Sequence, residues 1–266
     1  MTTATRPLAV VTGASSGIGL ELAKQFAQHD FDLVIVAEDA ELDAAAEQVR
    51  ACGAHVEAVR ADLAAADGVE ELVRRIDAAG RPVDALAVNA GVGINGEFAG
   101  DTLLEDQLTV VDLNVRSAVH LTKRVVPDMV ERGRGRVLFT SSIAATSPGP
   151  YQAVYAASKA FLSSFSEGLR GEVKDKGVTV TALLPGPVDT EFFERADMED
   201  TKIGAGPKDS AAEIAEAGYD ALMAGDDKVV AGSAKNKIQS AASRVLPDAA
   251  KAGQQGKMTK PGSADS

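Results

Sequence analysis

The sequence predicts an α/β fold: a doubly wound, Rossmann-like parallel sheet of about seven strands with helices on both faces. The first indication is that short apolar runs alternate with longer amphipathic runs, because strands covered on both faces are apolar throughout. The second is a glycine-rich turn, "TGASSGIG" at 12–19, directly after the first apolar run. A chain of 266 residues can bury a large core, and we expect one main domain over 1–234.

The individual elements follow from the short apolar runs, which indicate strands, and from the longer amphipathic runs, which indicate helices. The expected strands are 8–13, 32–37, 56–62, 85–91, 136–142, 178–186 and 228–232. Amphipathic patterns predict helices at 17–29, 40–52, 66–79, 102–131, 151–174 and 209–225. This order of elements is typical of a parallel sheet with crossover helices.

Two segments fall outside that alternation. Residues 187–208, called the lid segment below, follow a strand at the sheet edge where ligands bind, and we expect a mobile substrate lid there. After 234, "AKNKIQSAASRVL" predicts one more amphipathic helix. The last 20 or so residues are small, polar and weakly patterned, so we expect a poorly ordered tail within 235–266.

Composition excludes several classes of protein. The net charge of −12 argues against nucleic acid or an anionic membrane as a partner, and we find no apolar run long enough for a membrane span. Cys52 is the single cysteine, so no intrachain disulfide is possible, and we expect a cytoplasmic protein. Cys52, His29, His55 and His120 are widely scattered, which predicts no metal site.

The glycine-rich turn carries Gly13, Gly17 and Gly19 at the first strand–helix junction. Glycine permits a tight turn and a close backbone approach to a pyrophosphate, and the start of a helix favours an anion. The pattern therefore predicts a dinucleotide site. The alternative is a glycine-rich turn that only packing requires.

The end of the second strand bears on the choice of dinucleotide, because ribose recognition occurs there. Glu38 and Asp39 follow Ala37 at that point, and Ser16 in the glycine loop carries no charge. A carboxylate accepts a hydrogen bond from a ribose 2′-hydroxyl but repels a 2′-phosphate, so we favour NAD over NADP. Two alternatives stay open: the acids start a solvated helix, or both cofactors are used.

A set of short motifs now points to a family. In order they are "TGASSGIG" (12–19), "NAG" (89–91), Asn114, Ser142, Tyr155, Lys159 and "PGPVDT" (185–190). Together they resemble the short-chain dehydrogenase/reductase family, of its shorter single-domain type, over residues 6–232. The sequence departs from the family pattern at Val88, which stands where an asparagine is common.

The resemblance implies the residues of the site. The catalytic set would be Asn114, Ser142, Tyr155 and Lys159, with Ser142 selected over Ser141 because the family's serine lies 13 residues before the tyrosine. Cofactor contacts would come from Gly13, Ser15, Ser16, Gly17, Ile18, Gly19, Glu38, Asp62, Leu63, Asn89, Ala90, Gly91, Tyr155, Lys159, Pro185, Gly186, Val188 and Thr190.

The resemblance also implies the activity and the assembly. It implies an NAD(P)-dependent alcohol dehydrogenase or carbonyl reductase acting on a small secondary alcohol or ketone. Homodimers or homotetramers would form through the helices at 102–131 and 151–174. Ser142 would hold the substrate oxygen, Tyr155 would pass the proton, Lys159 would hold the nicotinamide ribose, and Asn114 would anchor a relay of waters.

Tyr155 and Lys159 have a physical relation of their own, since residues i and i+4 share one face of a helix. Tyrosine has a pKa near 10, and lowering it to about 7 requires roughly 4 kcal/mol. A cation at about 4 Å supplies about that much in an effective dielectric near 20. We therefore expect Lys159 to make Tyr155 an acid–base group at neutral pH, although such a pair taken alone is usually a surface pair.

Other readings remain open at this point. A non-catalytic dinucleotide-binding protein is the alternative function, and an epimerase or dehydratase is a third class. Phe192 and Phe193 either cover an apolar substrate or pack the lid segment. Tyr151 either lines the substrate pocket or packs, and Tyr219 has no predicted catalytic role.

Overall fold

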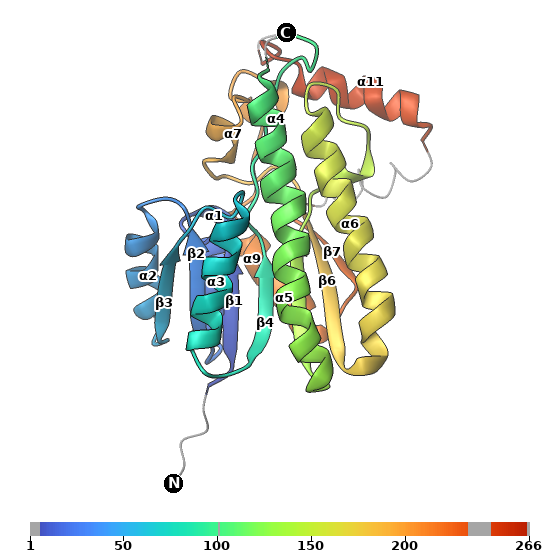
Figure 1. The fold of residues 1–266 in the computed structure, drawn as a ribbon. Helices are drawn as coiled ribbons and strands as arrows, with labels where there is room; N and C mark the ends of the chain where they lie inside the picture. Colours follow the sequence, from blue (N-terminus) through green and yellow to red (C-terminus); the bar gives the residue numbers. More distant parts are fainter. Residues whose placement is uncertain (1–5, 101, 234–245, 265–266) are drawn as a thin grey trace.

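The computed structural model describes residues 6–100, 102–233 and 246–264. Its seven strands form one parallel sheet in the order β3-β2-β1-β4-β5-β6-β7 (Figure 1). They are β1 Leu8–Thr12, β2 Asp32–Ala37, β3 Val56–Arg60, β4 Val83–Val88, β5 Gly135–Thr140, β6 Val178–Pro185 and β7 Lys228–Ala231. The predicted fold class is confirmed.

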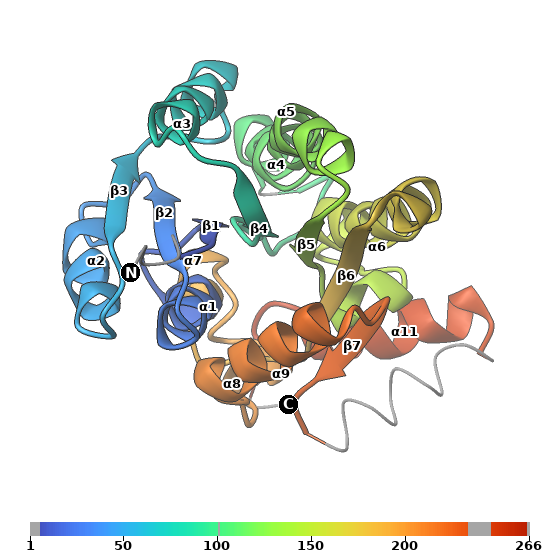
Figure 2. The same ribbon diagram turned by 90° about the horizontal axis from the view of Figure 1, so that it is seen from below.

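Helices cover both faces of the sheet (Figure 2). One face carries α1 Gly17–Gln28, α2 Leu42–Arg50 and α9 Ala211–Ala224; the other carries α3 Ala66–Ala78, α5 Ala118–Glu131 and α6 Ala153–Val173. Successive strand residues point to opposite faces, so Val10 belongs to one apolar core and Val11 to the other. Within the described ranges, no helix is both long and apolar enough to cross a membrane.

The strand order places the site. From β1 the chain runs outward to β2 and β3, then returns so that β4 lies on the other side of β1. At such a reversal the connections after the two strands diverge and leave a crevice at their carboxyl ends. The glycine loop follows β1 and the 89–91 motif follows β4, so both predicted motifs reach this crevice.

The helix expected at 102–131 is divided into three parts. They are α4 Leu104–Val111, the π-helical turn η1 Asp112–Ser117, and α5. A π-helical turn widens the helix by one residue and is common at functional positions. Here it contains Asn114, whose side chain bonds to the backbone of Val92 after β4. The periodicity of the sequence does not reveal such a local widening.

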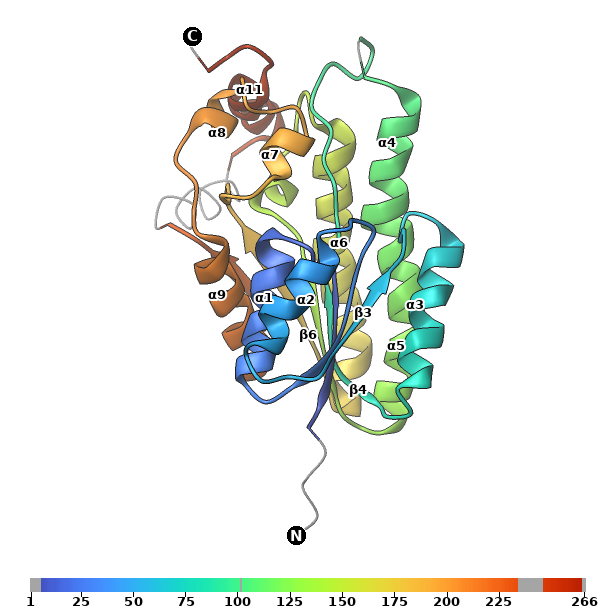
Figure 3. The same ribbon diagram turned by 90° about the vertical axis from the view of Figure 1, so that its left-hand side faces the viewer.

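The lid segment and the chain end lie beyond the carboxyl edge of the sheet (Figure 3). The lid segment contains two short helices, α7 Phe192–Arg195 and α8 Lys202–Ala205. The end of the chain forms α11 Asp248–Thr259, which packs against α8. The helix expected in "AKNKIQSAASRVL" falls at 234–246, all but the last residue of which lies outside the described residues.

The described part of the chain end, 246–264, makes specific contacts where the sequence predicts a poorly ordered tail. The Thr259 hydroxyl is fully buried and donates to the carbonyl of Pro150 at 2.8 Å. The backbone amides of Gly262 and Ala264 donate to the side chain and carbonyl of Asp200, at 2.6 and 2.9 Å. These partners lie far away in the sequence, so the local pattern gives no sign of them.

Candidate active site

The glycine loop between β1 and α1 is shaped for a close approach. Gly13 has a φ of +65°, and a Cβ there would lie 2.8 Å from the Cα of Ala90. A Cβ on Gly19 would overlap the carbonyl oxygen of Gly13. The first turn of α1 has no acidic residue and no side-chain cap, so its amides can receive an anion. This loop fits the diphosphate of a dinucleotide.

Asn89 ties the two sides of the crevice together. Its side-chain nitrogen donates to the carbonyls of Thr12 and Gly13, at 3.1 and 3.3 Å. The backbone amides of Asn89 and Ala90 both donate to the Thr12 hydroxyl at 2.9 Å. The side chain of Asn89 therefore joins the two strands, and Val88 at the preceding position does not disturb these bonds.

The end of β2 is more mixed in charge than its sequence indicates. Asp39 accepts a hydrogen bond from the Ser15 hydroxyl at 2.8 Å and pairs with Arg195 at 3.3 Å. The carbonyl of Glu38 accepts from the Arg60 guanidinium at 2.9 Å. Two guanidinium groups thus lie beside the two acids from which a preference for NAD was predicted. The sequence reading missed both, because they come from other segments.

The predicted catalytic residues come from three elements. Tyr155 and Lys159 lie on α6, Ser142 follows β5, and Asn114 lies in η1; all four are buried. Tyr155 and Ser142 both line the cavity, and the Ser142 hydroxyl acts to lower the pKa of the Tyr155 phenol. The neighbouring Ser141 instead bonds to the carbonyl of Lys159 at 2.7 Å, a structural role. Both serines line the cavity, and the choice of Ser142 over Ser141 stays a prediction.

Asn114 is connected to Tyr155 through the hydroxyl of Ser158. Its side chain accepts from the Val92 amide and donates to the Val92 carbonyl, both at 2.9 Å. It also donates to the Ser158 hydroxyl at 3.0 Å, which in turn donates to the carbonyl of Tyr155 at 2.7 Å. Asn114 therefore fixes the loop after β4 against the helix that carries Tyr155.

Burial dominates the ionisation of the tyrosine and the lysine. It raises the pKa of Tyr155 to about 12, although the Ser142 hydroxyl acts in the opposite direction. It lowers the pKa of Lys159 to about 8. The Lys159 ammonium donates to the Thr140 carbonyl at 2.9 Å and lies 5.8 Å from the centroid of the Tyr155 ring. Without a cofactor, burial therefore outweighs the charge of Lys159, and the acid–base role of Tyr155 stays a prediction.

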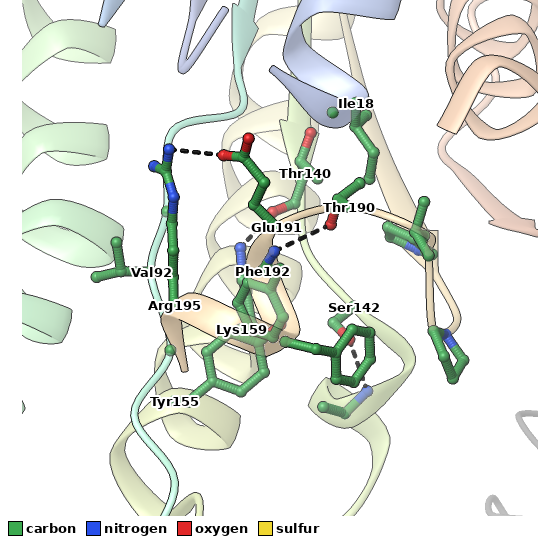
Figure 4. Close-up of a pocket in the computed structure, with 18 of the residues that line it drawn as sticks. Ile18, Val92, Thr140, Ser142, Tyr155, Lys159, Thr190, Glu191, Phe192 and Arg195 are labelled. Carbon is green, nitrogen blue, oxygen red and sulfur yellow. Dashed lines mark hydrogen bonds and ion pairs between the residues drawn. The ribbon is translucent and has the colours of Figure 1, made fainter. Parts of the chain in front are cut away.

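The two phenylalanines of the lid segment have different surroundings. The Phe192 ring lies 5.3 Å from the Tyr155 ring (Figure 4). Phe193 is buried in a small cluster with Ala196 and Met198. Both rings line the cavity, so the choice between covering a substrate and packing the lid segment stays open.

One cavity of about 570 Å³ joins these features. Asn114 does not line it; the predicted residues that do are Gly13, Ser15, Ser16, Gly17, Ile18, Gly19, Glu38, Asp62, Leu63, Asn89, Ala90, Gly91, Ser142, Tyr155, Lys159, Pro185, Gly186, Val188 and Thr190. The lining also includes residues that were not predicted: Gln152, Met198, Arg195, and Gln255 and Met258 from α11. Tyr151 is outside the lining, and Tyr219 packs against Phe26.

The chain is similar to proteins of one family in sequence. A family model for short chain dehydrogenases matches residues 7–200. An uncharacterized oxidoreductase of Myxococcus xanthus is 38% identical over 186 residues, which cover 69% of this chain and 73% of that protein. A short chain dehydrogenase of Pseudocercospora fijiensis is 36% identical over 73% of this chain, and the match spans 63% of that protein, less than two thirds of its length.

Solved structures agree with the sequence matches. A short-chain dehydrogenase from Sphingobium yanoikuyae in complex with NADPH is 30% identical, with 96% of this chain and 95% of that chain covered and a TM-score of 0.79. A 3-ketoacyl-(acyl-carrier-protein) reductase from Brucella melitensis complexed with NADH is 27% identical, with 84% and 94% covered and a TM-score of 0.74. From the family model, these relatives and the glycine loop, we conclude that the chain belongs to the short-chain dehydrogenase/reductase family of NAD(P)-dependent oxidoreductases.

Proposed function

We propose that the protein interconverts a secondary alcohol and a ketone, with Tyr155 as the acid–base group. The observation that carries this proposal is the buried group of Tyr155, Ser142 and Lys159, which lines the same cavity as the glycine loop. A bound nicotinamide dinucleotide would supply or accept the hydride. Phe192 beside Tyr155 favours an apolar group on the substrate.

Each side chain has a role that its surroundings support. Ser142 holds the substrate oxygen, and the Tyr155 hydroxyl exchanges a proton with that oxygen. Lys159, with three donors and one fixed on Thr140, is placed to hold the nicotinamide ribose. Asn114 positions the Tyr155 helix and the loop after β4, and we propose that it also anchors waters that relay the proton.

The pKa of Tyr155 favours one direction of the reaction. A phenol with a pKa of about 12 is protonated at neutral pH, so Tyr155 is prepared to donate a proton to the alkoxide that forms when a ketone is reduced. Oxidation of an alcohol needs the phenolate, which requires more positive charge near the ring than Lys159 provides here. In the cofactor-free state at neutral pH, the ionisation of Tyr155 thus suits the reduction of a ketone.

The cofactor preference is a separate proposal. Glu38 and Asp39 at the end of β2 support NAD, because their carboxylates can accept a bond from a 2′-hydroxyl. Arg60 and Arg195 beside them act in the opposite sense. We propose NAD as the preferred cofactor and NADP as a possible second one, to be decided by separate titrations with NADH and NADPH.

The test of the reaction uses three tyrosine and serine variants. Cyclohexanone and acetophenone serve as apolar ketone probes with NADH and with NADPH. Tyr155→Phe and Ser142→Ala should each lower turnover by about 100-fold or more while dinucleotide binding is kept. Tyr151→Phe is the matched control, since Tyr151 lies outside the cavity. Turnover within twofold of the parent in both site variants would refute the mechanism.

A non-catalytic dinucleotide-binding protein is the second candidate function. It is disfavoured because Tyr155 and Lys159 are both present, buried, and inside the cavity with the glycine loop. A parent protein that binds NADH but reduces none of a broad ketone panel would favour it.

We also propose that the chain forms a homodimer or homotetramer. Large apolar side chains are exposed on α4, α5, α6 and the loop before α4: Phe98, Leu103, Leu104, Leu108, Val111, Val119 and Phe161. Exposed apolar groups of this number on neighbouring helices mark an interface. Leu108→Glu should shift the mass measured by light scattering toward the monomer, whereas Gln48→Glu on α2 should not. An unchanged mass for Leu108→Glu would contradict this assignment.

A further inference from the structure

Arg195 connects the lid segment to the opposite wall of the cavity. It is the last residue of α7, and its guanidinium pairs with Glu191 at 2.7 Å (Figure 4). Its second terminal nitrogen pairs with Asp39, just after β2, at 3.3 Å. The lid segment thus reaches the region where the family recognises the ribose. All three residues line the cavity.

The same carboxylates also contact the glycine loop. Asp39 accepts from the Ser15 hydroxyl at 2.8 Å, and Glu191 accepts from the Ser16 hydroxyl at 3.5 Å, with the same oxygen that meets Arg195. Ser16 directly precedes α1, whose uncapped amides form the anion site. Asp39 and Glu191 therefore each link the Arg195 guanidinium to a serine of the glycine loop, next to the anion site at the start of α1.

These ion pairs are readily exchanged. The side chains of Arg195 and Glu191 are 48% and 51% exposed, so solvent screens their attraction. Partial burial opposes the charge on Arg195, but Asp39 and Glu191 outweigh it and raise the pKa of the guanidinium. Arg195 is thus a permanent cation with weakly held partners. A phosphate offers it a stronger, two-pronged set of hydrogen bonds.

Three lysines also line the cavity: Lys159, Lys202 and Lys208. Lys159 donates to the Thr140 carbonyl, Lys208 lies over the Phe193 ring at 5.0 Å, and Lys202 begins α8. Among these cations, Arg195 is the one that pairs with Asp39 and Glu191, the two carboxylates that contact the serines of the glycine loop.

We propose that Arg195 is the phosphate-binding residue of the lid segment: it exchanges Asp39 and Glu191 for a phosphate group of the dinucleotide and so draws the lid segment onto the glycine loop. This inference rests on the dinucleotide binding of the proposed function and is independent of the alcohol chemistry. The phosphate is either the diphosphate, common to both cofactors, or the 2′-phosphate, which NADP alone carries. The two sources predict different selectivities.

The experiment is a titration of the parent and of Arg195→Gln with NADH and, separately, with NADPH. Nicotinamide fluorescence is the readout, and the absence of tryptophan from the chain keeps its background low. A charge-assisted bond predicts a Kd about 10- to 100-fold weaker in the variant. An equal loss for both cofactors identifies the diphosphate, and a loss confined to NADPH identifies the 2′-phosphate.

Two further variants complete the design. Arg74→Gln removes a surface arginine that pairs with Glu71 outside the cavity, and it should leave both Kd values unchanged. Arg195→Lys keeps the charge but loses the two-pronged geometry, so its Kd should fall between those of the parent and Arg195→Gln. Equal thermal unfolding of parent and variants verifies the fold.

The outcomes separate this inference from the proposed function. Kd values for Arg195→Gln within twofold of the parent for both cofactors would overturn the role of Arg195 and leave the proposed function standing. A parent protein that binds neither dinucleotide would overturn both.

Discussion

The two ends of the cavity are held by different kinds of contact. At the end formed by the glycine loop, backbone meets backbone: Gly13 approaches Ala90, and Gly19 approaches the Gly13 carbonyl. At the other end, the lid segment and α11 meet the body through a few hydrogen bonds, such as those from the Thr259 hydroxyl to Pro150 and from the Asn95 amide to the Ala196 carbonyl. The first arrangement tolerates almost no added atom, whereas the second can lose a contact and open locally.

That difference assigns a task to each end. A rigid loop suits a ligand part that never changes, which is the dinucleotide. An end that opens at modest cost suits the exchange of substrate and product. Tyr155 and Lys159 on α6 lie between the two ends, and Phe192 brings the lid segment against Tyr155.

The largest effect is expected for an added methyl group in the glycine loop. In Gly19→Ala the new carbon would overlap the Gly13 carbonyl and lie 2.6 Å from the Asn89 side-chain nitrogen. Overpacking against backbone should lower the free energy of unfolding by about 3 kcal/mol or more and abolish NADH binding. Urea unfolding and the NADH titration measure the two effects.

The control places the same methyl group on an exposed helix position. Gly171 lies in α6 with no atom within 4 Å of the new carbon, so Gly171→Ala should stabilise by about 0.5–1 kcal/mol. Gly19→Ala with the stability and NADH affinity of the parent would show that the loop is not rigid.

The second effect concerns Lys159, between the two ends. Its pKa in the folded state, about 8, lies below the ordinary 10.5, so above pH 8 the unfolded chain holds a proton that the folded chain has lost. Stability therefore rises with pH between about 8 and 10.5. Tyr155, with its raised pKa, acts in the opposite direction only above pH 10.

Urea unfolding of the cofactor-free protein at about pH 7.5 and about pH 9.5 tests this prediction. Lys159 should contribute a gain of about 2 kcal/mol between the two values. Lys159→Met should lack that gain, and the difference between the two proteins removes the contribution of every other group. Equal pH dependence in parent and variant would mean that burial does not lower the pKa of Lys159.

The third effect is local and belongs to the opposite end. Thr259→Val keeps the shape of a fully buried side chain but removes its hydrogen bond to Pro150. Opening of α11 should become easier by about 1–2 kcal/mol, with little change in global unfolding. Hydrogen exchange of 248–259 and of α8 measures this opening.

Thr109→Val is the matched control for that experiment. It removes a similar bond, from Thr109 to the carbonyl of Glu105, on the exposed side of α4. It should leave exchange in α11 unchanged. If Thr259→Val also left that exchange unchanged, α11 would be held by other contacts.

The sequence predicts the glycine-loop end of the cavity better than the end formed by the lid segment and α11. The strands, most helices and the residues of the glycine loop are local patterns, so periodicity and glycine spacing reveal them. Gln255, Met258 and Arg195 reach the cavity through contacts between segments far apart in the chain, and no local pattern marks them. The direction of the Tyr155 pKa was missed for a related reason: burial outweighs a nearby charge, and burial is a property of the whole fold.

The smallest effect is expected for Gly253→Ala in α11, which is the counterpart of Gly19→Ala in the glycine loop. Gly253 is exposed in α11, and a Cβ there would meet no atom within 4 Å. Gly253→Ala should therefore strengthen α11 by about 0.5–1 kcal/mol, because alanine loses less backbone entropy in a helix than glycine does. Slower hydrogen exchange across 248–259 is the expected readout, opposite in sign to that of Thr259→Val. Faster exchange would mean that α11 is not the helix described here. A glycine-to-alanine substitution would then destabilise the glycine loop and stabilise α11. The loop has no room for a Cβ at Gly19, whereas α11 has room for one at Gly253.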